Sequence, residues 1–335
     1  MSVRVSVLCA LALASAGPAS AQGAKVSSAV ELARQADNLK PGQWVWAPQV
    51  APVGPIIVYV DLDRQLATVY RNGLRIGVST ISSGKEGHET PTGVFTILQK
   101  DKDHRSSTYN NAPMPYQERL TWDGVALHAG GLPGYPESHG CIHLPYEFSK
   151  LLFGVTQMGG TVVIAGRHGE PVTAREAGVL APFAAGGAAE AHVPLSGGEA
   201  YRWTPEASPS GPVSIIISKA DQRAVVLRNG VEIGRAHAEI DEDAVSTHVA
   251  TLAKGADGKA VWLRVGAPGH DDEAGQPIDA ATFEKIRAPK AFLDQVAQVM
   301  TVGTTVLVTA SPVGADNSGT RLTVLSAVKG DQVTP

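Results

Sequence analysis

A single cysteine lies between two histidines in the segment SHGCIHLP, Ser138 to Pro145, where its neighbours could make it a nucleophile. A thiol attacks a carbonyl carbon only as thiolate, and a free cysteine is mostly protonated near neutral pH. It therefore needs a basic or cationic neighbour. The residue types around Cys141 favour a reactive thiol over a small buried apolar side chain.

Three histidines are candidates for that neighbour: His128 on the preceding predicted strand, and His139 and His143 beside the cysteine itself. If residues 141–144 form a strand, its period of two places the side chains of Cys141 and His143 on one face. The same four side chains could instead hold zinc. The His-x-Cys-x-His spacing is unusual for zinc, and no glutamate nearby clearly serves as a base, so we expect no metal here.

The first residues set the compartment in which this thiol works. Arg4 precedes an apolar run that ends in the small residues Ala19, Ser20 and Ala21, as in a secretory signal peptide. Its removal would also remove Cys9 and leave Cys141 as the one cysteine of an exported, periplasmic protein. No later stretch is apolar enough for a membrane helix.

The composition favours a globular, mainly β protein. Hydrophobic residues make up 43% of the 335 residues and charged residues 18%, and the chain contains 22 Pro and 36 Gly. A net charge of -4 gives no reason to expect nucleic acid binding. The length favours two domains.

The elements that must position the thiol begin with a short helix predicted within residues 27–39 and a Pro-rich segment over residues 40–55. Residues 56–82 read as two or three strands, with Asn72 and Gly73 supplying the positive φ angles of a type I′ hairpin turn. We therefore expect a β-hairpin near the start of the first domain.

A repeat predicts the second domain. The string YRNGLRIG at 70–77 returns as LRNGVEIG at 227–234, and the strings VALHAGGLPG and GTVVIA have weaker counterparts in VWLRVGAPG and TTVLVT. On this alignment Arg264 takes the place of His128, and the second copy has no thiol.

The expected division of the chain follows from these features. It is a signal peptide (1–21), an N-terminal helix and Pro-rich segment (22–55), a catalytic domain (56–166), an Ala/Gly/Pro-rich linker (167–212), a degenerate non-catalytic repeat (213–310) and a C-terminal tail (311–335).

Four strings in order resemble the successive motifs of L,D-transpeptidase catalytic domains, the YkuD-like family. They are TPTGVFTI (90–97), NNAPMPY (110–116), LHAG (127–130) and SHGCIHL (138–144). The resemblance implies a β-sandwich-like catalytic domain, here followed by a degenerate copy of similar β-rich fold. It also implies a cysteine nucleophile that acts on peptidoglycan stem peptides without a cofactor.

The resemblance also implies roles for individual residues. His128 matches the general base of the family, and His139 matches a histidine close to the nucleophile and the bound peptide. The backbone N–H groups of His139, Gly140 and Cys141 would form the oxyanion hole, where glycine permits close approach of the substrate. The residues expected to contact substrate are Ser138, His143, Met114, Tyr116 and Trp122.

His143 departs from the family pattern, in which most relatives carry arginine at this position. Arginine grips a carboxylate bidentately at any working pH, whereas histidine titrates near neutrality. The resemblance implies an L,D-transpeptidase in which Cys141 attacks a tetrapeptide donor, expels its terminal D-alanine and transfers the remaining acyl group from the thioester to an amine.

Two alternatives remain open: hydrolysis of the same stems as a carboxypeptidase or endopeptidase, and a non-enzymatic cell-wall-binding protein. The sequence leaves the acceptor and the oligomeric state undetermined. The remaining histidines are expected on the surface or in loops: His88, His104, His168, His192, His237, His248 and His270.

Overall fold

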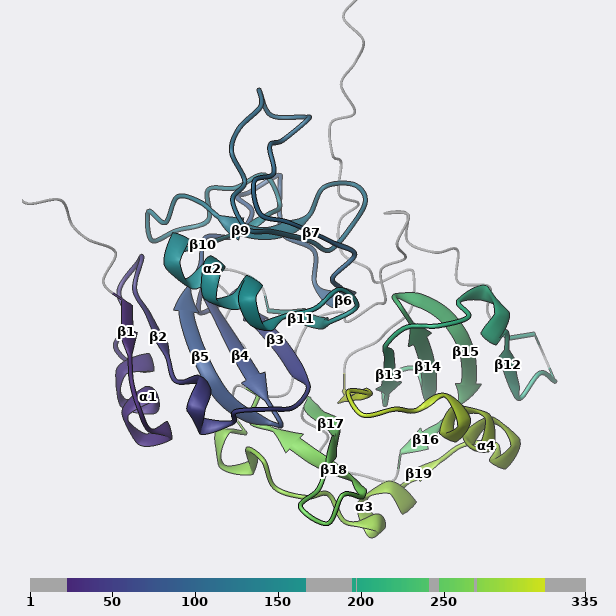
Figure 1. Cartoon of the computed structure of the whole chain (residues 1–335). Coiled ribbons are helices and arrows are strands. Elements are labelled where there is room, and N and C mark those ends of the chain that lie inside the picture. Colours follow the sequence, from purple (N-terminus) through teal and green to yellow (C-terminus); the bar gives the residue numbers. More distant parts are fainter. Residues whose placement is uncertain (1–22, 167–194, 197, 241–246, 268–269, 311–335) are drawn as a thin grey trace, which may run out of the picture.

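The protein is described here by a computed structural model, covering residues 23–166, 195–196, 198–240, 247–267 and 270–310 (Figure 1). The predicted signal peptide, the C-terminal tail and most of the predicted linker lie outside these residues. Three main sheets and four short α-helices make up the described chain, which is mainly β as expected. None of the described helices has the length and apolar character that a membrane crossing requires.

The first sheet has seven strands and contains the predicted hairpin. Its strands, in spatial order, are β1 (Gly23–Lys25), β2 (Trp44–Trp46), β5 (Leu74–Thr80), β4 (Leu66–Arg71), β3 (Ile56–Asp61), β11 (Thr161–Ala165) and β6 (Gly93–Thr96). Asn72 and Gly73 join β4 to β5 with φ angles of 51° and 76°, which confirms the expected turn. The predicted N-terminal helix is α1 (Ala29–Ala36), and the hydroxyl of Ser28 caps it by accepting the N–H of Glu31.

A second sheet of four short strands lies across a shared core from the first. Its spatial order is β10 (Ile142–Leu144), β9 (Ala126–Ala129), β8 (Gln117–Arg119) and β7 (Gln99–Asp101). Helix α2 (Tyr146–Val155) follows β10 directly. Val58 of the first sheet, Leu127 of the second and Phe148 of α2 belong to one buried cluster. The small sheet and α2 are therefore held against the large sheet by apolar packing.

The third sheet again has seven strands. Their order is β12 (Tyr201–Trp203), β15 (Val231–His237), β14 (Arg223–Arg228), β13 (Val213–Ser218), β20 (Thr305–Thr309), β17 (His248–Lys254) and β18 (Ala260–Val265). A two-stranded pair, β16 (Glu239–Ile240) and β19 (Ile286–Arg287), lies beside it with α3 (Ala280–Glu284) and α4 (Lys290–Val299). The short 3₁₀ turns are η1 (Pro48–Val50), η2 (Pro205–Ala207) and η3 (Asp271–Glu273).

Six strands of the first and third sheets follow the same order and pair in the same directions, namely β2-β5-β4-β3-β11-β6 and β12-β15-β14-β13-β20-β17. A register shift falls at Val69/Tyr70 in one and at Val226/Leu227 in the other. This correspondence supports a duplication, which stays our interpretation of the chain.

The proposed alignment of Arg264 with His128 is wrong. Arg264 lies on β18, which pairs with β17 inside the third sheet, whereas His128 lies on β9, which pairs with β10 in the small sheet. Similar short apolar strings do not determine which strand each will pair with. The antiparallel bridge between Ser82 and His143 instead corresponds to the antiparallel pair Glu239 and Arg287 beside the third sheet.

Two strands lie outside the bounds expected for the two β-rich domains. Strand β2 lies in the segment expected to precede the catalytic domain, yet it pairs with β5 inside the first sheet. Strand β12 lies in the expected linker and pairs with β15 inside the third sheet. Each sheet therefore begins before the position that the β-rich strings suggested.

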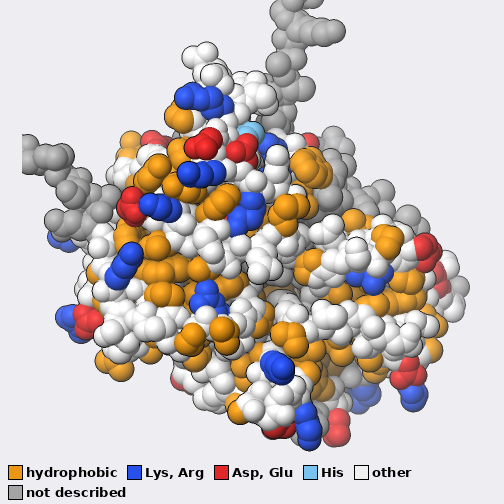
Figure 2. Space-filling model, viewed as in Figure 1, with side chains coloured by type: hydrophobic (Ala, Val, Ile, Leu, Met, Phe, Trp, Pro, Cys, Tyr) orange, Lys and Arg blue, Asp and Glu red, His pale blue; other side chains and the backbone are white. Residues whose placement is uncertain are grey.

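The two large sheets share an apolar core. One buried cluster takes Ile57, Tyr70 and Val163 from the first sheet and Ile216 and Leu307 from the third. The hydroxyl of Tyr70 donates a hydrogen bond to the carbonyl of Gly266 within this contact. On the face of the described residues shown in Figure 2, basic and acidic side chains are interspersed, in keeping with the small net charge.

Candidate active site

The small sheet pairs the strand that carries His128 with the strand that carries His143 and directly follows Cys141. Strands β9 and β10 run parallel, and their register sets His143 directly opposite His128. Cys141 is the residue before β10, so the strand period places it on the face that carries His143. The alternate residues Ile142 and Leu144 are buried in the core on the other side. The burial of Ile142 and Leu144 agrees with the predicted alternation.

The thiol is protonated in the resting site. Its Sγ donates a hydrogen bond of 3.3 Å to the carbonyl of Gly124. Burial raises the pKa of Cys141 to about 11, opposed by a backbone hydrogen bond at Ala126 and by the charge of Arg119. A base must therefore remove the proton before or during attack.

His128 has the properties of that base. Its side chain is buried, and its Nδ1 lies 2.9 Å from the carbonyl of Ala129. Because a carbonyl only accepts, Nδ1 carries the proton and Nε2 keeps a free lone pair. Burial lowers the pKa of His128 to about 4, so the ring is neutral near pH 7.

His143 is held from two sides. Its Nδ1 lies 3.2 Å from the carbonyl of Gly131 and 3.6 Å from Oε1 of Glu137, and its ring meets that of His128 edge-on at 4.8 Å. Burial lowers the pKa of His143, while the Gly131 carbonyl and Glu137 oppose that change. Near neutral pH a smaller fraction of His143 is therefore charged than of an ordinary histidine, so it binds a carboxylate more weakly.

His139 lies outside this buried pair. It is exposed, and its ring lies 4.7 Å from that of His88 and 4.9 Å from that of Tyr109. Burial, followed by the charges of Lys85 and His88, lowers the pKa of His139. These neighbours place His139 among surface rings, where a substrate could reach it.

The turn before the thiol is tightly bonded. Ser138 Oγ donates to the carbonyl of Cys141 at 2.6 Å and accepts the N–H of Gly140 at 3.2 Å. Thr90 Oγ1 donates to the carbonyl of Gly140 at 3.0 Å, and Gly140 has a φ of 106°. The expected oxyanion hole stays a prediction, and the Gly140 N–H of that set already has a partner. Ser138 is buried and stabilises the turn, and its expected substrate contact is replaced by these bonds.

The expected substrate contacts of Met114 and Tyr116 also differ from the structure. Both side chains are buried, and the rings of Tyr146 and Phe153 on α2 lie 5.3 Å and 5.7 Å from that of Tyr116. Their apolar surface is used for packing. Trp122 is 51% exposed, in the turn whose Gly124 carbonyl accepts the thiol hydrogen. Of the three, Trp122 alone remains available to a ligand.

Arg119 is a residue of this site that the sequence did not reveal. It lies on β8, donates through Nε to Gln99 at 3.0 Å and has its guanidinium 5.8 Å from the ring of Trp122. Its charge favours the thiolate of Cys141. No motif marks Arg119, since it reaches the thiol across the sheet.

The alternative of zinc at the thiol finds no geometric support. Within the described residues, Cys141 and its three histidines do not bring three ligand atoms within 4.8 Å of one another. The only group of this kind among the described residues lies away from the thiol, at His248, His270 and Glu273. A neutral imidazole on the strand that pairs with β10 instead suits a general base.

Comparison with known proteins identifies this region. Residues 55–164 match the family described as YkuD, L,D-transpeptidase catalytic domain. No curated protein is significantly similar to the chain.

Among solved structures, three L,D-transpeptidases are similar over about a third of this chain. That from Stackebrandtia nassauensis is 29% identical with a TM-score of 0.33, covering 34% of this chain and 57% of its own. That from Mycobacterium tuberculosis H37Rv is 23% identical with a TM-score of 0.32, covering 33% and 57%. That from Mycobacterium smegmatis is 24% identical with a TM-score of 0.31, covering 33% and 58%. The match thus spans little more than half of each of these chains.

Proposed function

We propose that this protein, whose residues 55–164 match the L,D-transpeptidase catalytic domain, is an acyltransferase that acts on peptidoglycan stem peptides through Cys141. The observation that carries the proposal is a protonated thiol directly before β10 together with a buried, neutral imidazole on the paired strand β9. A thiol and a neutral histidine together form a nucleophile and its general base.

In the acylation step, Nε2 of His128 accepts the proton from Sγ of Cys141. The sulfur forms a bond to the carbonyl carbon of the residue that precedes the terminal D-amino acid of the stem. Collapse of the tetrahedral intermediate breaks the C–N bond, and His128 returns the proton to the leaving amine. The products are a Cys141 thioester and a free D-amino acid.

The N–H groups of His139 and Cys141 are the remaining donors for the oxyanion at this turn. Each such donor is worth about 2.7 to 4 kcal/mol of barrier in well-studied hydrolytic enzymes. The Gly140 N–H could join them only by leaving the hydroxyl of Ser138. Only participation of the Gly140 N–H would therefore require a rearrangement of this turn.

In the second step, an amine of another stem or of a wall-attached protein attacks the thioester carbon. His128 takes the amine proton, the C–S bond breaks, and the thiolate of Cys141 regains the proton. The enzyme returns to its resting state, so the cycle needs no oxidant, metal or nucleotide. We place the protein in the periplasm, on the ground of the signal-like residues 1–21.

Mass spectrometry tests this function directly. The full chain without its first 21 residues is incubated with a disaccharide-tetrapeptide, and we expect an acyl adduct on Cys141 together with a released D-amino acid. The Cys141→Ala variant should form neither, whereas His237→Ala, a change at an exposed histidine on β15, should behave as wild type. Adduct-free turnover, or activity in the Cys141→Ala variant, would rule out the cysteine mechanism.

A further inference from the structure

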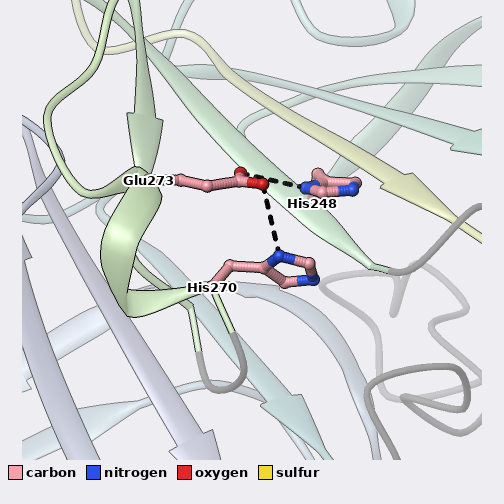
Figure 3. A group of neighbouring side chains, drawn as sticks. All are labelled: His248, His270 and Glu273. Carbon is pink, nitrogen blue, oxygen red and sulfur yellow. Dashed lines mark hydrogen bonds and ion pairs between the residues drawn. The ribbon is translucent and has the colours of Figure 1, made fainter.

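Three titratable side chains outside the proposed active site converge in the third sheet (Figure 3). His248 opens strand β17, His270 lies in the segment after β18, and Glu273 ends the η3 turn. The Nδ1 atom of His248 is 3.2 Å from Oε2 of Glu273, and that of His270 is 3.3 Å from Oε1. All three side chains are partly buried, with 27%, 15% and 24% of their surface exposed. His270 lies in a loop, as expected, whereas His248 opens a strand.

The separations match the edges of a metal coordination shell. A tetrahedral zinc ion holds imidazole nitrogens and carboxylate oxygens at about 2.0 to 2.2 Å, so neighbouring ligand atoms lie about 3.3 to 3.6 Å apart. The two contacts to Glu273, 3.2 Å to Oε2 and 3.3 Å to Oε1, lie at or just below the lower end of this range, and the ligand atoms of all three residues lie within 4.8 Å of one another. Two imidazoles and one carboxylate are a donor set that suits zinc and its neighbours in the first transition series.

A further side chain orients the carboxylate. Arg264 on β18 contacts Oε2 of Glu273 through Nη1 at 3.2 Å and so holds the carboxylate in place. Carboxylates that bind metals are commonly held by a second hydrogen-bonding partner in this way. Nε2 of His270 is buried without a partner among the described residues. Hydrogen bonds within the cluster therefore leave part of it unsatisfied.

The cluster is specific to the third sheet. His248 pairs with Val308 of β20, and the residue that occupies this register in the first sheet is Gly93, opposite Ile164 of β11. Glycine has no side chain to bind an ion. His248 is thus not part of the strand pattern that the two sheets share. The reason for a histidine at this position must lie in its own neighbours, His270 and Glu273.

We propose that His248, His270 and Glu273 bind one zinc-type divalent cation, with a fourth position open to water. The ion would tie the start of β17 to the segment that follows β18. That segment contacts the first sheet, where Gly266 N donates to the carbonyl of Gly73 at 3.4 Å and Gly275 packs beside Leu74. The ion is therefore assigned a structural role at the junction of the two large sheets, independent of the acyl transfer proposed above.

The test uses the full mature chain carrying Cys141→Ala, so that the thiol cannot bind metal. After treatment with a chelator, the protein is titrated with zinc chloride by calorimetry, with magnesium chloride as the comparison. We expect one zinc ion per chain and no heat from magnesium. Removing one direct ligand should weaken zinc binding by more than the roughly 10- to 100-fold that loss of an outer-shell partner costs.

The variants are His248→Ala, His270→Ala and Glu273→Gln, with His237→Ala as the matched control at an exposed histidine. Cobalt chloride added to the unmutated cluster gives a readout that does not depend on any of these variants folding. Visible absorption typical of four-coordinate cobalt supports the site. Zinc binding that is absent from the parent protein, or that persists in all three variants, overturns the proposal, as does cobalt with no such absorption.

Discussion

At the scale of single residues, the site pairs two groups that are both uncharged at rest. The pKa of Cys141 is raised to about 11 and that of His128 is lowered to about 4, and burial is the main cause in each case. Near pH 7 the thiol keeps its proton and the imidazole keeps its lone pair. A preformed thiolate–imidazolium pair is therefore not the resting state. The proton must move as the substrate carbonyl is attacked, when the developing oxyanion can be stabilised.

His128→Ala should slow acylation by about 10²- to 10⁴-fold, the range typical for a general base. The substrate does not need the ring for binding, so KM should change little. Single-turnover formation of the Cys141 adduct measures the effect, with His139→Ala as the comparison. A dead His139 variant beside a nearly normal His128 variant would mean that the exposed histidine is the base.

Arg119→Gln should raise the pKa of Cys141 further, because the guanidinium charge favours the thiolate. Below pH 11 the thiolate fraction grows about tenfold per pH unit, so alkylation of wild type by iodoacetamide should climb without levelling from pH 7 to 10. The variant should react more slowly at each pH. Arg105→Gln, at an exposed loop arginine, is the control. Equal rates in wild type and the Arg119 variant would show that Arg119 does not act on the thiol.

At the scale of elements, local chemistry was predictable and strand pairing was not. Asn72 and Gly73 encode their own turn, and the two-residue alternation about Cys141 follows from strand geometry alone. The parallel pairing of β9 with β10 joins residues far apart in the chain, so no local string encodes it. Arg119 lies on β8, on the other side of β9 from β10, so its effect on the thiol depends on that pairing. This explains why the sequence did not reveal its role. The false match of Arg264 with His128 has the same origin.

The turn that carries the nucleophile should not tolerate a side chain at Gly140. Its φ of 106° is a conformation that residues with a Cβ rarely adopt, and the strain costs on the order of 1 to 3 kcal/mol. Gly140→Ala should therefore lose most acyl transfer while retaining the fold.

Gly154 in α2 provides a matched control, because a Cβ there meets no atom within 4 Å. Gly154→Ala should leave activity unchanged and raise helix stability by about 0.5 to 1 kcal/mol. Activity assays and urea unfolding of both variants decide the matter. An active Gly140→Ala protein would show that the turn is less constrained than its backbone indicates.

At the scale of the whole molecule, folding stability should depend on the protonation of His128. Its pKa is about 4 when folded and 6.5 without the protein environment, so the unfolded chain binds more protons between these values. The free energy of unfolding therefore rises with pH between these two values. Above pH 6.5 the contribution of His128 has reached its full size. The contribution of this one buried group is about 3 kcal/mol.

Urea unfolding from pH 4 to 7.5 measures this dependence. His128→Asn should flatten the profile relative to wild type, and His237→Ala should not. Parallel profiles for wild type and His128→Asn would contradict the buried, neutral histidine.

The shared core between the large sheets makes a further prediction at this scale. Residues 198–310 expressed alone would expose Ile216, Leu307 and their neighbours, which the first sheet covers in the full chain. We expect this fragment to bind a hydrophobic dye and to associate, although its own core remains complete. Analytical ultracentrifugation against the full chain tests this. A monomeric fragment that binds no dye would show that the two sheets pack only weakly.

The close approach of Gly73 to the third sheet has a consequence for separating the two halves of the protein. A Cβ on Gly73 would lie 2.3 Å from the carbonyl oxygen of Arg264, which is a backbone atom and cannot move aside as a flexible side chain could. One methyl group at the tip of this hairpin would therefore force the first and third sheets apart. Gly73 thus both closes the hairpin turn and limits how closely the two halves can approach. A single substitution at Gly73 would therefore disturb the turn and loosen the junction at the same time.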